Sequence, residues 1–211
     1  MLTQTPQSFD DWWNVPETWI ETPNQRRNGW SGMIRATIEG QTFFIKKQCN
    51  HLYRSCQHPF GQPTVNREFE NITTLTRIGV CVPEPVFHGT RKTDDGYQGL
   101  LVTRELSGFS ALGDQTNLDP TQRETLAREI GRVLGLVHKH GLQHSCLYDK
   151  HIMIRWQNAT PEIALIDLEK MRRRILPRQA AKHDLEQLHR RQSIWSEQEW
   201  RILEQAHRAP C

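Results

Sequence analysis

The sequence predicts an α+β fold of two lobes, in which a sheet with one helix is followed by a mainly helical part. Apolar residues alternate with polar ones over Met33–Ile38, as they do in a half-buried strand. They recur at helical spacing over residues 66–75 and again over residues 126–137. The 211 residues are enough for a single domain with a substantial core. We therefore expect one domain, with lobes of about residues 1–104 and 105–211.

Composition is typical of a soluble protein. No apolar run approaches the roughly 20 residues that span a bilayer, so no transmembrane segment is expected. Met1–Asp10 lacks the basic start and apolar core of a secretory signal. The net charge of +3 gives no support for a nucleic-acid partner. The odd number of cysteines does not suggest a disulfide framework, which favours a reducing cytoplasm; they are Cys49, Cys56, Cys81, Cys146 and Cys211.

Residues His144–Ile154 have the outline of a kinase catalytic loop that runs into a short apolar strand. Such a loop carries an Asp two residues after the His, which orients the acceptor hydroxyl, and a later Asn, which holds a metal ion. In this chain Cys146 occupies the Asp position and His151 the Asn position. A helix comes before the loop, and the apolar strand Ile163–Ile166 delivers Asp167 after it. This order of elements is that of the second half of a kinase core.

The loop pattern His-x-x-Leu-Tyr-x-Lys-His-Ile, followed by Ile-Asp-Leu-Glu, resembles the lipopolysaccharide kinases that phosphorylate Kdo or heptose, and especially their InaA-type branch. The resemblance covers about residues 28–191. It implies a two-lobed protein-kinase-like fold with a reduced helical second lobe, and binding of ATP and Mg²⁺. It also implies a sugar acceptor, without identifying the sugar.

The N-terminal stretch contains Trp12, Trp13 and Trp19. Three tryptophans this close form either an exposed docking patch, such as one at a membrane interface, or an anchor that fixes the leading segment to the domain. We favour the anchor.

A hairpin is predicted over residues 33–46. Gly29 and Gly32 precede it and would let a turn approach nucleotide phosphates closely, although an ordinary turn would use them equally well. Lys46 stands where the resemblance implies the phosphate-holding Lys. Lys47 is the competing choice, but alternation along a strand puts the two on opposite faces. Lys46 is preferred because it follows an apolar pair, as the kinase Lys does.

The helix predicted over Asn66–Leu75 corresponds to the kinase C helix, which offers a carboxylate to the phosphate-holding Lys. Glu68 lies in an Arg-Glu-Phe motif that resembles the family's, so it is the expected partner of Lys46. Glu70 is the reserve candidate.

A buried strand at Leu100–Thr103 leads into Arg104–Gly108, which we interpret as the hinge between lobes. In kinase-like folds hinge backbone groups bind adenine, so the main-chain N–H and C=O groups of Glu105 and Leu106 are assigned this role. Asp119-Pro120 marks the next helix start, because Asp caps a helix and Pro is tolerated in its first turn.

The resemblance implies that Asp167 binds the Mg²⁺ that bridges ATP phosphates, with His151 as a further metal ligand. An Asp that caps the strand exit is the alternative. Downstream, Asp184 resembles the family's Asp at a helix start, which implies that it binds backbone N–H groups of the catalytic loop. A plain helix N-cap would satisfy the same residue.

Cys146 leaves the loop without the usual carboxylate base. A positioned base contributes about 10²- to 10⁴-fold in rate, so its loss slows a kinase without necessarily abolishing activity. Asp149 and His144 are substitute bases to consider, although the geometry of such loops directs Asp149 elsewhere and that His is structural in most kinases. Cys146 itself is an activated thiolate if a cation lies nearby, and an inert buried thiol otherwise.

A different interpretation takes five residues as a structural zinc cluster: His138, His140, His144, Cys146 and His151. It is disfavoured because His138 and His140 fall on different helix faces and the set lacks paired short spacings. A basic run, Lys170–Arg174 with Arg178 beyond it, is either a solvated surface or an attractor of phosphate on a lipid head group, a glycolipid or a nucleic acid. Its position after Asp167 favours an anionic substrate.

The resemblance thus implies an ATP-dependent kinase acting on a sugar hydroxyl of lipopolysaccharide core or a related anionic glycolipid. Its expected place is the cytoplasm of a Gram-negative bacterium, in peripheral contact with the inner membrane. The alternative is a catalytically silent kinase fold, a pseudokinase, that binds nucleotide or a partner in a regulatory or stress role. Cys146 favours this alternative.

Overall fold

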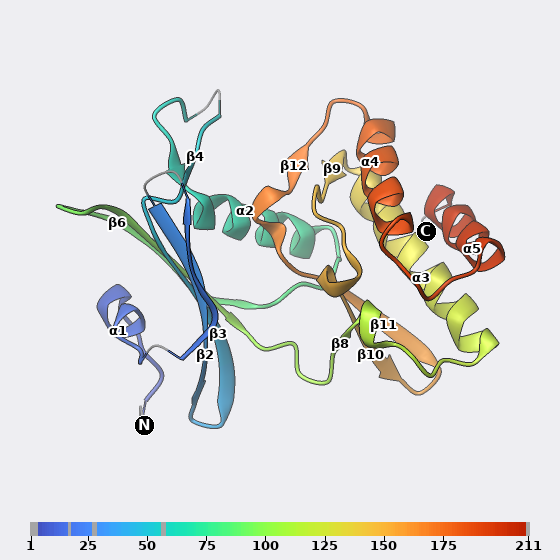
Figure 1. The fold of residues 1–211 in the computed structure, drawn as a ribbon, viewed down its shortest axis with the longest axis horizontal. Coiled ribbons are helices and arrows are strands. Elements are labelled where there is room, and N and C mark those ends of the chain that lie inside the picture. The colour runs from blue at the N-terminus through green and yellow to red at the C-terminus, as the bar shows by residue number, and fades with distance from the viewer. Residues whose placement is uncertain (1–3, 17, 27–28, 56–57, 210–211) are drawn as a thin grey trace. The chain divides into compact units, whose positions relative to one another are not determined.

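The computed structural model describes residues 4–16, 18–26, 29–55 and 58–209 (Figure 1). The chain divides into two compact units. The first comprises residues 1–72 and 83–106, and the second comprises residues 73–82 and 107–211. No helix in the described ranges is long and apolar enough to cross a membrane.

The first unit is built on a five-stranded antiparallel sheet with the strand order β1-β2-β3-β7-β6 (Figure 1). The strands are β1 (Trp19–Arg26), β2 (Gly29–Ile38), β3 (Gln41–Cys49), β6 (Pro85–Thr93) and β7 (Gly96–Arg104). A short hairpin of β4 (Leu52–Tyr53) and β5 (Gln62–Pro63) precedes α2 (Thr64–Arg77). The predicted hairpin is confirmed as β2 and β3.

The N-terminal tryptophans anchor the leading segment to this sheet. Helix α1 (Phe9–Trp13) buries Trp12 to 1% exposure, with its ring edge-on to Phe43 at a centroid distance of 5.4 Å. The rings of Trp13 and Trp19 both contact that of Trp30. Because aromatic side chains carry large apolar areas, their burial stabilises the attachment of α1. The anchor interpretation is therefore confirmed.

The same packing decides between the two neighbouring lysines. Lys47 is 1% exposed, and its ammonium donates a hydrogen bond to the carbonyl of Val15 at 3.2 Å. The ring centroids of Trp13 and Trp19 lie 5.8 and 6.0 Å from the same ammonium. Since successive side chains of a strand point to opposite faces, Lys46 projects from the other face of β3.

Gly29 and Gly32 both belong to β2, so the prediction that they form a turn is wrong. A Cβ on Gly29 would lie 2.3 Å from the backbone of Asn50, and one on Gly32 would lie 2.5 Å from the ring of Trp19. The chain's own packing therefore requires glycine at both positions. Contact with nucleotide phosphates stays a prediction.

The second unit packs α3 (Pro120–Lys139) with α4 (Pro177–His189) and α5 (Glu197–Arg208) (Figure 1). Asp119 caps α3 and Pro120 is its first residue, as predicted. A Cβ added to Gly131 of α3 would lie only 2.2 Å from the carbonyl oxygen of Leu203 in α5. Glycine therefore allows the two helix backbones to approach closely.

Short strands and 3₁₀ turns flank the loops of the second unit. Strands β8 (Ser110–Ala111), β10 (Ile152–Gln157) and β11 (Thr160–Leu165) form one sheet in the order β11-β10-β8, and β9 (Leu142–Gln143) pairs with β12 (Arg172–Arg173). The 3₁₀ turns are η1 (Leu112–Asp114), η2 (Asp149–His151) and η3 (Leu168–Lys170). The kinase-like loop thus lies between β9 and β10, and Asp167 follows β11.

Candidate functional site

A buried ion pair joins β3 to α2 in the first unit. The ammonium of Lys46 lies 2.7 Å from a carboxylate oxygen of Glu68, and the two side chains are 12% and 10% exposed. Glu70, the reserve candidate, occupies an exposed position. Burial of one of these charges without the other would leave a desolvated ion, so the two side chains hold each other in place. The predicted pairing of Lys46 with Glu68 is present.

The hinge prediction needs a correction at one group. The backbone N–H of Glu105 donates to the carbonyl of Thr42 at 2.9 Å, which extends the β3–β7 pairing. Its carboxylate accepts from Arg35 at 2.8 Å. The Glu105 N–H is therefore occupied within the sheet and is not available to adenine. Adenine binding by its carbonyl and by Leu106 stays a prediction.

In the second unit, Asp184 holds the kinase-like loop by its backbone. The buried carboxylate accepts from the N–H of His144 at 2.5 Å and from the N–H of Ser145 at 3.0 Å. His138 of α3 donates to the same carboxylate through Nε2 at 3.2 Å. Burial alone would raise the pKa of Asp184, but the hydrogen bonds and charge of its neighbours, led by His138, hold that pKa below its ordinary value. Asp184 is therefore a carboxylate at neutral pH.

The loop-holding role implied by the resemblance is thus present, but its place in the helix differs from the prediction. Helix α4 begins at Pro177, so Asp184 lies inside the helix and is not an N-cap. One turn later, Gln187 accepts from the N–H of Leu147 at 2.7 Å. Sequence reasoning missed Gln187, although its i, i+3 spacing from Asp184 puts both side chains on one helix face.

His144 is enclosed beneath the loop. It is 1% exposed, and its Nε2 donates to the carbonyl of Ile166 at 3.0 Å. Burial lowers its pKa, so the ring stays neutral at pH 7. Nε2 carries the proton and bonds within the protein, and the Nδ1 atom that bears the lone pair is buried, so the geometry favours a structural role for His144 over that of a base.

Cys146 has a cation beside it but is not activated. Its thiol is within hydrogen-bonding reach of the Lys170 ammonium, which tends to stabilise a thiolate. Burial has the larger effect and raises the pKa of Cys146 above the ordinary value for a thiol. The group is consequently a thiol at neutral pH, with little capacity to act as a base or a nucleophile.

His151 and Asp167 form a pair suited to a cation. Nδ1 of His151 lies 2.7 Å from the carbonyl of Cys146, so Nδ1 must carry the proton. In the neutral ring Nε2 then presents a lone pair, and it lies 3.5 Å from a carboxylate oxygen of Asp167. Two such acceptors repel each other unless a proton or a metal ion lies between them. The pair therefore fits the metal ligation expected of both residues.

Backbone strain accompanies this pair. Asp167 has φ 58° and ψ 57°, and Ser145 has φ 69°, although neither residue is glycine. Such left-handed conformations are uncommon and concentrate at functional sites. Asp167 stands at the N-terminus of η3 without making a side-chain capping bond, so the capping alternative has no support.

The five-residue zinc cluster is wrong, because its histidines are engaged elsewhere. His138 bonds to Asp184 and, at 2.8 Å, to His207, whereas His140 bonds to the carbonyl of Leu136. In the described part of the chain, no group of three or more His, Cys, Asp or Glu side chains is placed to hold a metal ion. Cys49, Cys81 and Cys146 are free thiols, while Cys56 and Cys211 lie outside the described residues.

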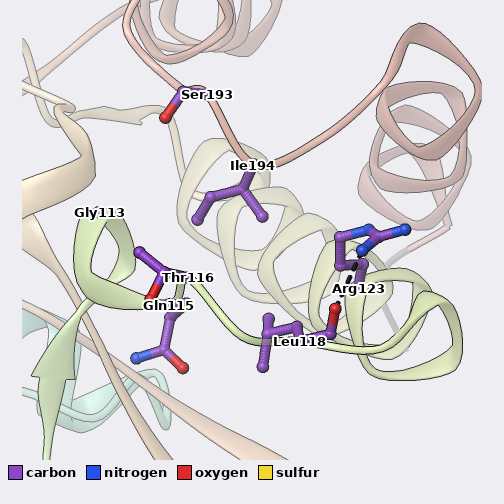
Figure 2. A pocket seen from close by; sticks show the side chains of 7 residues that line it. All are labelled: Gly113, Gln115, Thr116, Leu118, Arg123, Ser193 and Ile194. Carbon is purple, nitrogen blue, oxygen red and sulfur yellow. Dashed lines mark hydrogen bonds between the residues drawn. The ribbon is translucent and has the colours of Figure 1, made fainter.

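The carboxylate of Asp149, the other candidate base, accepts a hydrogen bond from the backbone N–H of Lys150 at 2.8 Å and lies against η1. A Cβ on Gly113 of η1 would lie 3.0 Å from that carboxylate. A cavity of about 230 Å³ next to η1 (Figure 2) is lined by Gly113, Gln115, Thr116, Leu118, Arg123, Ser193 and Ile194. The guanidinium of Arg123 bonds to the Leu118 carbonyl and to Glu199, so its charge is matched within the protein. The cavity is smaller than the roughly 300 Å³ of typical ligand sites.

These features can be compared with known proteins. A model of the lipopolysaccharide kinase (Kdo/WaaP) family matches residues 10–207. The chain belongs to this family. Protein InaA of Escherichia coli (strain K12) is 35% identical over 186 residues, which are 85% of this chain and 86% of that protein. The family predicted from the loop pattern is confirmed.

Solved structures support the fold. WaaP in complex with acyl carrier protein matches with a TM-score of 0.70 at 20% identity, over 98% of this chain and 87% of that one. The Rio2 kinase from Chaetomium thermophilum, in an ADP/Mg²⁺-phosphoaspartate complex, matches with a TM-score of 0.50 at 15% identity, over 92% and 62%. The protein-kinase-like α+β fold is confirmed.

Proposed function

We propose that the protein is an ATP-dependent kinase that phosphorylates a sugar hydroxyl of lipopolysaccharide core or a related anionic glycolipid. The observation that carries the proposal is the buried Lys46–Glu68 pair, because a costly buried ion pair at the family's phosphate-holding position has a direct catalytic use. We place this activity in the cytoplasm, in peripheral contact with the inner membrane.

In this proposal ATP binds with a divalent ion, as ADP does with Mg²⁺ in the Rio2 kinase complex. Lys46 would hold nucleotide phosphates, and His151 and Asp167 would hold the ion, which would supply positive charge to offset that of the phosphates. Asp184 keeps the loop in the conformation that positions His151.

Transfer of labelled γ-phosphate from ATP to dephosphorylated lipopolysaccharide core tests the proposed reaction. We expect slow labelling by the wild type, because the site lacks a base, and none by Lys46→Ala. Lys92→Ala, which removes an exposed Lys of β6, is the matched control and should label normally. Nucleotide binding without labelling of any core acceptor would contradict the kinase proposal.

A specific observation also favours the pseudokinase as the second candidate function. Cys146 occupies the base position as a protonated thiol, and neither Asp149 nor His144 is oriented to replace the missing base. Such a protein would bind nucleotide and report the bound state to a partner. Lys46, Glu68 and Asp167 would then serve nucleotide binding alone.

The donor set predicts an unusual metal preference. Imidazole is a better ligand for transition metals than for Mg²⁺, so the His151–Asp167 pair should bind Mn²⁺ in preference to Mg²⁺ when nucleotide is present. His151→Asn supplies an oxygen donor and should shift the preference toward Mg²⁺. Electron paramagnetic resonance of bound Mn²⁺, titrated with competing Mg²⁺, measures the change. An unchanged competition constant in the variant would exclude His151 as a ligand.

A further inference from the structure

We propose that the segment Arg172–Arg178, called here the basic loop, docks onto an anionic lipid bilayer. It comprises β12, the turn that follows and the start of α4 in the second unit (Figure 1). At its centre Ile175 is 98% exposed and the adjacent Leu176 is 55% exposed. Exposed aliphatic side chains in sequence are unfavourable in water, and they mark a surface with a partner when they stand among charges.

Positive charge surrounds this aliphatic pair on both sides. Arg172 and Arg173 precede it, Arg178 follows it, and all three are exposed. Lys182, one helical turn beyond Arg178, has a side chain that is 77% exposed, but its ammonium lies 3.9 Å from the carboxylate of Glu186, so it adds little to this charge. Between Glu169 and the buried Asp184 the sequence contains no acidic residue. The surface is therefore strongly cationic and complementary to anionic head groups.

The basic loop is fixed to the strand that leads into the kinase-like loop. Arg174 donates through Nε to the side chain of Gln143 at 2.6 Å, and through its backbone N–H to the carbonyl of Gly141 at 2.7 Å. Arg174 is thus bound within the protein, unlike the exposed arginines on either side of it. Strand β12 pairs with β9, and His144 follows β9 directly. A bilayer that binds the basic loop would therefore lie near the start of the kinase-like loop.

An anionic lipid bilayer matches the exposed arginines and the exposed aliphatic pair together better than other polyanions do. Arginines bind phosphate head groups, while an aliphatic pair at the tip of a loop enters the acyl boundary. A nucleic acid offers phosphates but no apolar medium for Ile175. An acidic protein would need an apolar pocket of matching shape as well as negative charge. The inference adds to the proposed function a means of reaching an acceptor in the membrane, and it does not require turnover.

The test is co-sedimentation with vesicles of phosphatidylglycerol and phosphatidylcholine, compared with phosphatidylcholine alone, without nucleotide. We expect binding only to the anionic vesicles, with affinity that falls as salt rises. The variant R172Q/R173Q/R178Q should bind about 100-fold more weakly, since each basic residue near the surface adds attraction. The control R128Q/R201Q/R208Q removes the same charge from exposed sites on α3 and α5 and should bind like the wild type.

A second variant tests insertion. Ile175→Ser with Leu176→Ser keeps every charge, and both positions are exposed, so the folded state should accept the change. The variant should bind vesicles about tenfold more weakly, because it loses the apolar surface that would be buried in the bilayer. Equal binding by the two arginine variants would overturn the proposal, as would an unchanged affinity of the serine variant. Binding of acyl carrier protein through the basic loop, without vesicle binding, would also overturn it. Because nucleotide is absent, neither result depends on kinase activity.

Discussion

Replacing Cys146 by Asp is expected to raise the rate of phosphoryl transfer by about 100-fold, the lower end of what a positioned base contributes. The new carboxylate would occupy the position at which a kinase orients the acceptor hydroxyl. The rest of the site needs no change, because Asp184 already holds the backbone of the loop. Steady-state transfer to lipopolysaccharide core, or ATP hydrolysis as its proxy, measures the effect.

Lys170 lies near position 146, so the Cys146→Asp experiment needs controls that account for its charge. Its ammonium, now near the Cys146 thiol, would pair with a carboxylate at the same position and keep it ionised. Cys146→Asn matches the shape of Asp without a basic group, so it should leave the rate at the wild-type value. Cys146→Asp combined with Lys170→Met should be less active than Cys146→Asp alone, because burial raises the pKa of a carboxylate that has lost its cation.

The outcomes separate the two candidate functions. An activity that stays at background in Cys146→Asp, with nucleotide binding intact, would identify a binding module whose acceptor site is lost. If Cys146→Asp and Cys146→Ser both abolish a measurable wild-type activity, the thiol participates directly and the interpretation of position 146 as a vacant base site is wrong.

Replacing Asp184 by Ala is expected to lower the free energy of unfolding by about 3 kcal/mol or more, since each buried donor left without an acceptor costs about 1–3 kcal/mol. The carboxylate serves His144 N–H, Ser145 N–H and His138, all in buried or partly buried surroundings. Ser145 would also lose the contact that holds its left-handed backbone. Urea unfolding measures the loss, and hydrogen exchange at the His144 and Ser145 amides locates it.

The effect of Asp184 should depend on pH in one direction. Its pKa is lower in the folded chain than in the unfolded one, so its stabilisation is complete above the unfolded pKa of about 3.9 and disappears as pH falls through the folded value. The difference between wild type and Asp184→Ala should therefore be largest at neutral pH. Glu186→Ala, which removes an exposed carboxylate from the same helix, should change stability by less than about 0.5 kcal/mol. A similar loss in both variants would contradict the loop-holding role.

Local pattern was enough to predict much of the fold and the ion pair. Alternation placed Lys46 and Lys47 on opposite faces of β3, and helical spacing placed Glu68 on α2. The pairing of Lys46 with Glu68 was then expected from the family resemblance. Capping chemistry identified the start of α3 at Asp119-Pro120. These features depend on residues close together in sequence, where backbone geometry constrains side-chain direction.

Contacts between distant segments could not be predicted in the same way. Nothing near Lys170 in the sequence indicates that its ammonium lies beside Cys146, and nothing near Gly32 indicates that Trp19 fills the space next to it. The bond from His138 to Asp184 depends on how α3 packs against α4. Each of these pairs is set by tertiary packing, which the period of a hydrophobic pattern does not contain.

The proposed function requires the chain to bind ATP with a divalent ion, with Lys46 and Asp167 among the ligands, and thermal unfolding with and without ATP and Mg²⁺ tests this requirement most directly. A ligand at about 100 times its Kd adds about 2.7 kcal/mol to the stability of the folded state, so the melting temperature of the wild type should rise by several degrees. Lys46→Ala and Asp167→Asn, each compared with its own ligand-free baseline, should lose the shift, while the control Lys92→Ala keeps it. Absence of any shift in the wild type, with any nucleotide and with either Mg²⁺ or Mn²⁺ over a wide concentration range, would contradict the account.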